Sequence, residues 1–161
     1  MSGGDARRSL AYWRDRMRSG LDVLAAAKLV QADEHQRLVA LAVQHAPASA
    51  AADDVLVAVV AEGDADRGDG EPCLIDLETL AIAPNDYDLG RTWYRWPMSP
   101  AQRAVYLDGY STYRDPEPFV AHLRFWRLVA LVEGAVFRHE QRRPDVAEPM
   151  AGLRALLAGE D

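Results

Sequence analysis

The stretch from Asp115 to about His139 constrains the fold more than any other, because it is the longest and most apolar helical pattern in the chain. Asp115 and Pro116 open it in the way that a capping residue and a first-turn proline open a helix. Its large apolar residues are Phe119, Leu123, Phe125, Trp126, Val129, Leu131, Val132, Val136 and Phe137. We expect this segment to form one helix at the centre of the core.

Three helical patterns are expected near the N-terminus. From Arg7 to about Arg18, apolar residues recur every three or four positions among charged ones, which predicts an amphipathic helix. Gly20 permits a break, and residues 21–29 indicate a second, apolar helix. Residues 31–44 predict a third helix with one apolar and one polar face.

The C-terminal half carries further helix signals. Residues 84–94 predict a helix with several aromatic side chains. Ser99 is followed by a proline and, three residues on, by Gln102, which is a typical start for a helix that continues to about residue 113. A last helical segment is expected at 149–157.

Between these groups of helices, the chain has a pattern typical of a β-hairpin. Residues 54–60 are a run of β-branched and apolar residues, which indicates a strand. A turn rich in glycine and aspartate follows at 62–71, and residues 74–76 then form the returning strand. Because side chains alternate faces along a strand, Asp76 and Glu78 are predicted to project to the same side.

The sequence Leu-Ile-Asp-x-Glu that ends at Glu78, followed after about ten residues by Asp-Leu-x-Arg ending at Arg91, resembles a kinase signature. It is similar to the C-lobe motif of the aminoglycoside and choline phosphotransferase-like kinases. The resemblance extends loosely over 10–142 and is specific only over 75–91. It implies a mostly helical α+β fold, a protein-kinase-like C-lobe with one β-hairpin. The residue patterns alone also predict a helix-rich α+β domain with one hairpin.

The resemblance also implies a magnesium site. Asp76 corresponds to the family's strand Asp, a Mg²⁺ ligand, and Asp54 replaces an Asn that precedes the other strand. Carboxylate oxygens suit Mg²⁺, so both are candidate metal ligands. Asp76 is also compatible with a solvated side chain at the end of a strand. Glu78, Asp88 and Arg91 are interpreted as structural: Asp88 near a helix start, and Arg91 as the ion-pair partner of a carboxylate such as Glu78.

Two parts of such a kinase are missing from the sequence. Between His45 and Asp53 there is no aspartate to orient an acceptor hydroxyl, although Asp53 itself is a conceivable substitute. The single lysine, Lys28, lies in an apolar helical segment, and nothing before Leu10 resembles the β-rich lobe that holds ATP. We therefore predict no catalytic residue and no cofactor site in the chain alone. Mg²⁺ and ATP are expected only if a partner completes the site.

A cluster of aromatic residues follows the motif. Trp93, Tyr94 and Trp96 are either part of the core or the wall of a groove for an acceptor or a partner.

Composition and charge exclude several classes of protein. A chain of 161 residues with 49% hydrophobic and 27% charged residues suits one domain, 1–161. Within it we expect a loose tail at 1–5, helices at 6–45, the hairpin at 54–78 and a helical subdomain at 84–158. The net charge of −7 argues against nucleic-acid binding.

The sequence also bears on the compartment. A single cysteine, Cys73, suits the reducing cytoplasm, and no apolar run approaches the ~20 residues that cross a membrane. The N-terminus lacks the apolar core of a signal peptide, so a cytoplasmic protein without a membrane partner is predicted.

Together, these observations favour a catalytically degenerate phosphotransferase C-lobe that acts as a binding or scaffold subunit. Its expected partner is another protein or further copies of itself. The alternative is an ATP-dependent small-molecule phosphotransferase with a hydroxyl acceptor, completed by a partner that supplies the nucleotide lobe. An incomplete reading frame is a third hypothesis.

Overall fold

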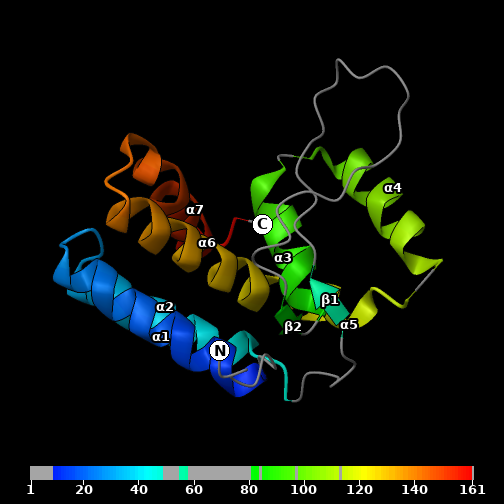
Figure 1. Cartoon of the computed structure of the whole chain (residues 1–161), viewed down its shortest axis with the longest axis horizontal. Helices are drawn as coiled ribbons and strands as arrows, with labels where there is room; N and C mark the ends of the chain where they lie inside the picture. The colour runs from blue at the N-terminus through cyan, green and yellow to red at the C-terminus, as the bar shows by residue number, and fades with distance from the viewer. Residues whose placement is uncertain are drawn as a thin grey trace, which may run out of the picture.

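The computed structural model describes residues 9–48, 55–57, 81–83, 85–96, 98–112 and 114–160. These residues are mainly helical, and Figure 1 shows how the helices are arranged. The elements in chain order are α1 (Leu10–Ala26), α2 (Ala32–His45), β1 (Val55–Val57), β2 (Ala81–Ala83), α3 (Asn85–Arg95), α4 (Pro100–Ser111), α5 (Glu117–Ala121), α6 (Leu123–Glu140), the short 3₁₀ helix η2 (Pro144–Val146) and α7 (Ala147–Ala158).

Helix α6 is the central helix, which confirms the prediction from its apolar sequence. Eight of its side chains are buried: Phe125, Trp126, Leu128, Val129, Ala130, Leu131, Val132 and Ala135. It packs against α1, α2, α3, α5 and α7, and no other described helix has as many neighbours. A helix with apolar residues on nearly all of its sides can remove them from water only by packing against neighbours on several sides.

Helices α1, α2, α6 and α7 form a bundle, with α1 and α6 side by side (Figure 1). Helices α1 and α6 run in the same direction, each starting at the end of the bundle nearer to α5 (Figure 1). Helices α6 and α7 are antiparallel, since Arg124 near the start of α6 donates to the carbonyl of Leu156 near the end of α7.

Three glycines, Gly20, Gly90 and Gly152, let helices approach α6 closely. A Cβ at Gly20 would lie 2.5 Å from Cγ1 of Val132, and one at Gly90 would lie 2.9 Å from the backbone oxygen of Trp126. The predicted helix break at Gly20 is wrong: α1 continues through it from Leu10 to Ala26. The glycine provides space for α6, and the packing of α1 compensates for its low helix propensity.

The long predicted helix is interrupted near its start. His122 has φ −117° and ψ 19°, so α5 ends there and α6 begins at Leu123. The Nδ1 atom of His122 lies 3.0 Å from the carbonyl oxygen of His45 at the end of α2. This contact ties the interruption to the bundle, and a single continuous helix from Asp115 is therefore a wrong prediction.

Helix α4 confirms the start predicted at Ser99. The Ser99 hydroxyl accepts from the backbone N–H of Gln102, and the Gln102 side chain accepts from the backbone N–H of Ser99, which completes a capping box. The helix has no fully buried side chain, although Tyr106 and Tyr110 pack partly against the core. In Figure 1 it lies beyond α3, away from the four-helix bundle.

The predicted fold class, a kinase-like α+β C-lobe built around one β-hairpin, is wrong. Among the residues whose burial the structure describes, which do not include β1 and β2, every buried hydrophobic side chain of the core lies on a helix, apart from Val30 in the α1–α2 connection. The described strand pairing joins only β1 to β2 over three residues each, antiparallel with Leu56 opposite Ile82. The predicted returning strand at 74–76 lies outside the described residues. The described core is therefore built by helices around α6.

None of the helices in the described ranges combines the length and apolar character needed to cross a membrane.

Candidate functional site

Most of the predicted metal site cannot be placed. Asp54, Asp76 and Glu78 lie outside the described residues, as do the turn at 62–71 and the predicted returning strand at 74–76; of the predicted first strand, only β1 is described. Among the residues that are described, no three His, Cys, Asp or Glu side chains come together in a way that could hold a metal ion.

The two described residues of the kinase-like motif lie on α3. Asp88 is half-buried in the first turn, and burial raises the pKa of its carboxyl, while the charge of Arg91 lowers it in part. The guanidinium of Arg91 lies 5.8 Å from the ring centre of Tyr87. Asp88 and Arg91 are thus neighbours on one helix.

The predicted aromatic cluster divides between two sides of α3. Trp93 is buried against Phe119, with ring centres 5.5 Å apart, and Arg103 lies 5.2 Å above its ring. Tyr94 faces α6 instead, where its hydroxyl accepts a hydrogen bond from Arg138. Trp96 is half-buried after the end of α3. The structure therefore does not bring Trp93 and Tyr94 together into one wall.

The described residues form a different candidate site, a groove between α1 and α6. It encloses about 460 Å³ and is lined along α1 from Tyr12 to Val23 and along α6 from Val132 to Glu140. Val132 and Val136 form apolar parts of its lining, and Phe137 on the α6 side is 52% exposed. Tyr12 and Val23 are also among the exposed large hydrophobic residues, at 37% and 38%. Three of the six exposed large hydrophobic side chains of the described residues thus line this groove.

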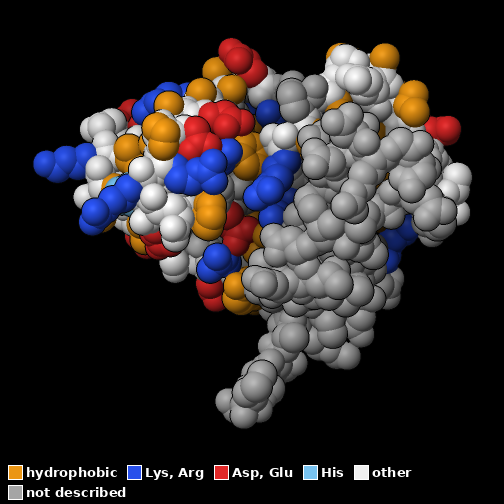
Figure 2. All heavy atoms as spheres, turned by 45° about the horizontal axis from the view of Figure 1, so that its top comes forward, with side chains coloured by type: hydrophobic (Ala, Val, Ile, Leu, Met, Phe, Trp, Pro, Cys, Tyr) orange, Lys and Arg blue, Asp and Glu red, His pale blue; other side chains and the backbone are white. Residues whose placement is uncertain are grey.

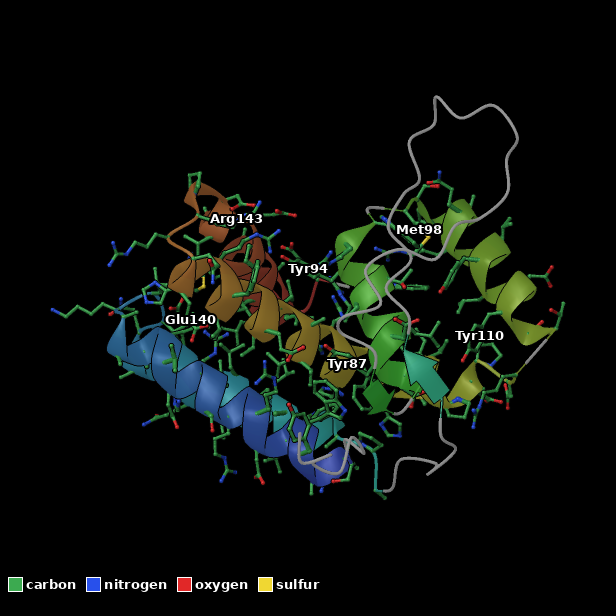
Figure 3. All side chains as sticks on the ribbon, viewed as in Figure 1. Tyr87, Tyr94, Met98, Tyr110, Glu140 and Arg143 are labelled. Atoms are coloured by element: carbon green, nitrogen blue, oxygen red, sulfur yellow. The ribbon has the colours of Figure 1, made fainter. Side chains whose placement is uncertain are left out.

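One carboxylate links three helices in the wall of this groove. Glu133 of α6 accepts hydrogen bonds from Arg16 of α1 and from the hydroxyl of Tyr87 of α3. The bond to Glu133 raises the pKa of Arg16 above its usual value. Tyr87 in turn stacks on Trp13 with ring centres 3.7 Å apart. Figure 3 shows Tyr87 on α3, near the bundle. These contacts hold the walls in place.

Two other carboxylates of the lining, Asp15 and Glu140, form no ion pair with any described residue. Both are exposed, and Glu140 lies near the end of α6 away from Tyr87 (Figure 3). The lining contains three carboxylates and one guanidinium, and that guanidinium, Arg16, is already bound to Glu133. The groove therefore carries an excess of negative charge over apolar walls.

Charged and apolar side chains are mixed on the surface. Figure 2 shows apolar side chains interspersed with acidic and basic ones on the described part of the face that it presents. At the groove itself, the apolar lining stands beside Asp15, Arg16 and Glu140, as charged residues do at the rims of protein interfaces.

The sequence contains a partial signal for this groove. On α1, Tyr12, Ser19 and Val23 lie at helical spacing on one face, beside the face that carries the buried Trp13 and Met17. The predicted break at Gly20 divided that face. The second wall is more than a hundred residues away in the chain, and no local pattern pairs it with α1.

Comparison of the chain with protein-family models, with curated proteins and with solved structures finds no match. The phosphotransferase resemblance thus rests on its short motif alone.

Proposed function

We propose that this chain is a non-catalytic binding or scaffold subunit that docks a segment of a partner protein in the groove between α1 and α6. The observation that carries the proposal is the half-exposed Phe137 in the same groove as Val23 and Tyr12, on walls that the hydrogen bonds of Glu133 hold together. Exposed aromatic residues on a preformed concave surface are the usual anchors of protein interfaces.

A small molecule fits this groove less well than a protein segment. A volume of about 460 Å³ is within the range of ligand pockets, but such pockets enclose most of the ligand surface. Here the largest apolar groups, Phe137 and Tyr12, are exposed at 52% and 37%. An occupant must therefore cover the rim as well as fill the floor, and a protein segment does both.

The alternative function, a phosphotransferase completed by a partner, is not supported by a specific observation. Its candidate metal ligands Asp54 and Asp76 lie outside the described residues. The kinase-like fold on which it depends is contradicted by the helical core. The groove lies on α1 and α6, whereas the motif lies at 75–91.

Photocrosslinking tests the proposal. A photoreactive phenylalanine analogue at position 23 in the groove is compared with the same analogue at position 43 on α2, where Val43 is 72% exposed outside the groove. In the native host we expect a discrete crosslinked product from position 23 and none from position 43. A Phe137→Asp change in the same chain should abolish it. Equal labelling at both positions, or a product that persists with Phe137→Asp, would show that the groove does not dock a protein.

A further inference from the structure

We infer that the occupant of the α1–α6 groove is a basic amphipathic helix, with apolar side chains toward the groove floor and Lys or Arg beside Asp15 and Glu140. This inference rests on the proposed function and specifies the chemistry of its partner.

The shape of the groove favours a helix. Its α1 wall extends from Tyr12 to Val23, which is about 16 Å at 1.5 Å per residue. Its two walls are helices that run in the same direction, so a third helix can lie along the groove, over their line of contact, and place side chains from every third or fourth position into it. Ser19 and Gly20 have small side chains, so they leave space in the groove along this part of α1.

The charge of the groove favours a basic helix. Asp15 on one wall and Glu140 on the other are exposed and form no ion pair with described residues. The one cation of the lining, Arg16, is already bound to Glu133. Of the other arginines of α1, Arg14 donates to the carbonyl of Pro47, beyond the end of α2, and Arg18 is exposed but does not line the groove. A partner with cations flanking its apolar face therefore finds two carboxylates, whereas an acidic partner meets repulsion on both sides.

A second copy of the chain is a weaker candidate. The chain has a net charge of −7, so two copies repel each other before any contact forms. Exposed apolar side chains such as Phe137 and Val23 are also too few for a self-complementary dimer interface of the usual size.

Selection from a displayed library tests the inference. The library consists of helical peptides of about 18 residues with randomised surface positions, and it is sorted for binding to the purified full chain. Enriched peptides are then titrated by fluorescence anisotropy against three variants. These are Asp15→Asn/Glu140→Gln, the matched surface control Asp33→Asn/Asp108→Asn, and Phe137→Asp. All substituted positions are exposed, and circular dichroism verifies the fold of each variant.

We expect enriched peptides to have apolar residues at helical spacing flanked by Lys or Arg. The Asp15→Asn/Glu140→Gln chain should bind them about tenfold more weakly, and the surface control should bind them as the original chain does. Enriched peptides that need Phe137 but are neutral or acidic would overturn this inference and leave the docking groove intact. Failure to enrich any peptide, or a dimer of the free chain that Phe137→Asp dissociates, would also overturn it. The photocrosslinking experiment tests the proposed function independently of these peptide measurements.

Discussion

Two carboxylates of the described helices lie in opposite electrostatic settings. Burial raises the pKa of Asp88, with only a partial offset from Arg91. The carboxyl of Glu34 has a lowered pKa, first because it accepts the backbone N–H of Gln31 and then because Arg154 donates to it. The two residues should therefore affect the pH dependence of stability with opposite signs.

Replacement of Asp88 by asparagine should stabilise the protein at pH 7. A raised pKa means that the folded state binds the proton more tightly than the unfolded state. The contribution of Asp88 to the unfolding free energy therefore decreases as pH rises from 3.8 through the raised folded value. We expect Asp88→Asn to raise the melting temperature by about 2 °C at pH 7, and the gain to vanish as pH falls toward 3.8. Thermal unfolding across this pH range measures it.

Glu34→Gln is the matched control. The lowered pKa of Glu34 means that its stabilisation is present above the unfolded value of 4.5 and is lost as pH falls through the folded one. This variant should melt below the original protein at pH 7. A decrease in melting temperature for Asp88→Asn as well would mean that the Asp88 carboxylate has a stabilising partner.

Glu133 provides a second test at the scale of single residues, because it is bound by both Arg16 and Tyr87. Tyr87→Phe removes the hydroxyl that donates to Glu133, and Glu133→Gln removes the charge that both donors bind, in a half-buried wall. We expect Tyr87→Phe and Glu133→Gln each to lower the unfolding free energy by about 1–2 kcal/mol. The double variant should lose about 1 kcal/mol less than the sum. Urea denaturation gives all four values, and simple additivity would contradict the link.

Among the elements, the crossing of α1 and α6 depends on Gly20. A methyl group there meets Cγ1 of Val132 at 2.5 Å, so α1 must shift or Val132 must change rotamer. We expect Gly20→Ala to lower the unfolding free energy by about 1–3 kcal/mol despite the better helix propensity of alanine. Val132→Ala in the same chain should recover part of the loss. Chemical denaturation measures both changes.

Gly109 on α4 is the control for this prediction. It also lies within a helix, but a Cβ there meets nothing within 4 Å. Gly109→Ala should therefore be neutral or stabilising by up to about 1 kcal/mol, since only the propensity term remains. Equal effects at positions 20 and 109 would mean that packing against Val132 does not limit the α1–α6 contact.

These elements show what could be predicted from sequence. The helix start at Ser99 was predictable because its capping box is local, with both hydrogen bonds within four consecutive residues. The role of Gly20 was not, because its reason lies on α6, more than a hundred residues away. The interruption at His122 was missed for the same reason, since its contact is the carbonyl of His45. Hydrogen bonds between residues close in the chain could be predicted from the sequence, whereas these contacts between distant helices could not.

At the scale of the whole molecule, the short motif over 75–91 is a weaker indication of the fold than the apolar pattern of α6. Asp88 and Arg91 stand on a helix, as predicted for 84–94, but many helices carry an acidic first turn. The apolar surface of α6 was the stronger indication, because it requires neighbours on several sides and so favours an all-helical core. The groove could not be predicted, since it depends on how α1 and α6 are paired.

The arrangement around α6 predicts that the bundle and α3 unfold as one unit. Trp13 of α1 stacks on Tyr87 of α3, and Trp126 of α6 packs at Gly90 of α3, so no helix of this group separates without exposing the others. Trp13, Trp93 and Trp126 are all buried, and their fluorescence therefore reports on tertiary packing in α1, α3 and α6.

Urea transitions followed by tryptophan emission and by far-ultraviolet circular dichroism should therefore coincide. Leu128 of α6 is fully buried, and Leu128→Ala should shift both curves together by about 2–5 kcal/mol. The exposed Val43→Ala serves as the control and should leave both within about 0.5 kcal/mol. If Leu128→Ala shifted the fluorescence curve while the circular dichroism curve stayed in place, helices would persist after the tryptophans become exposed. In that case α6 would not be the element on which the rest of the fold depends.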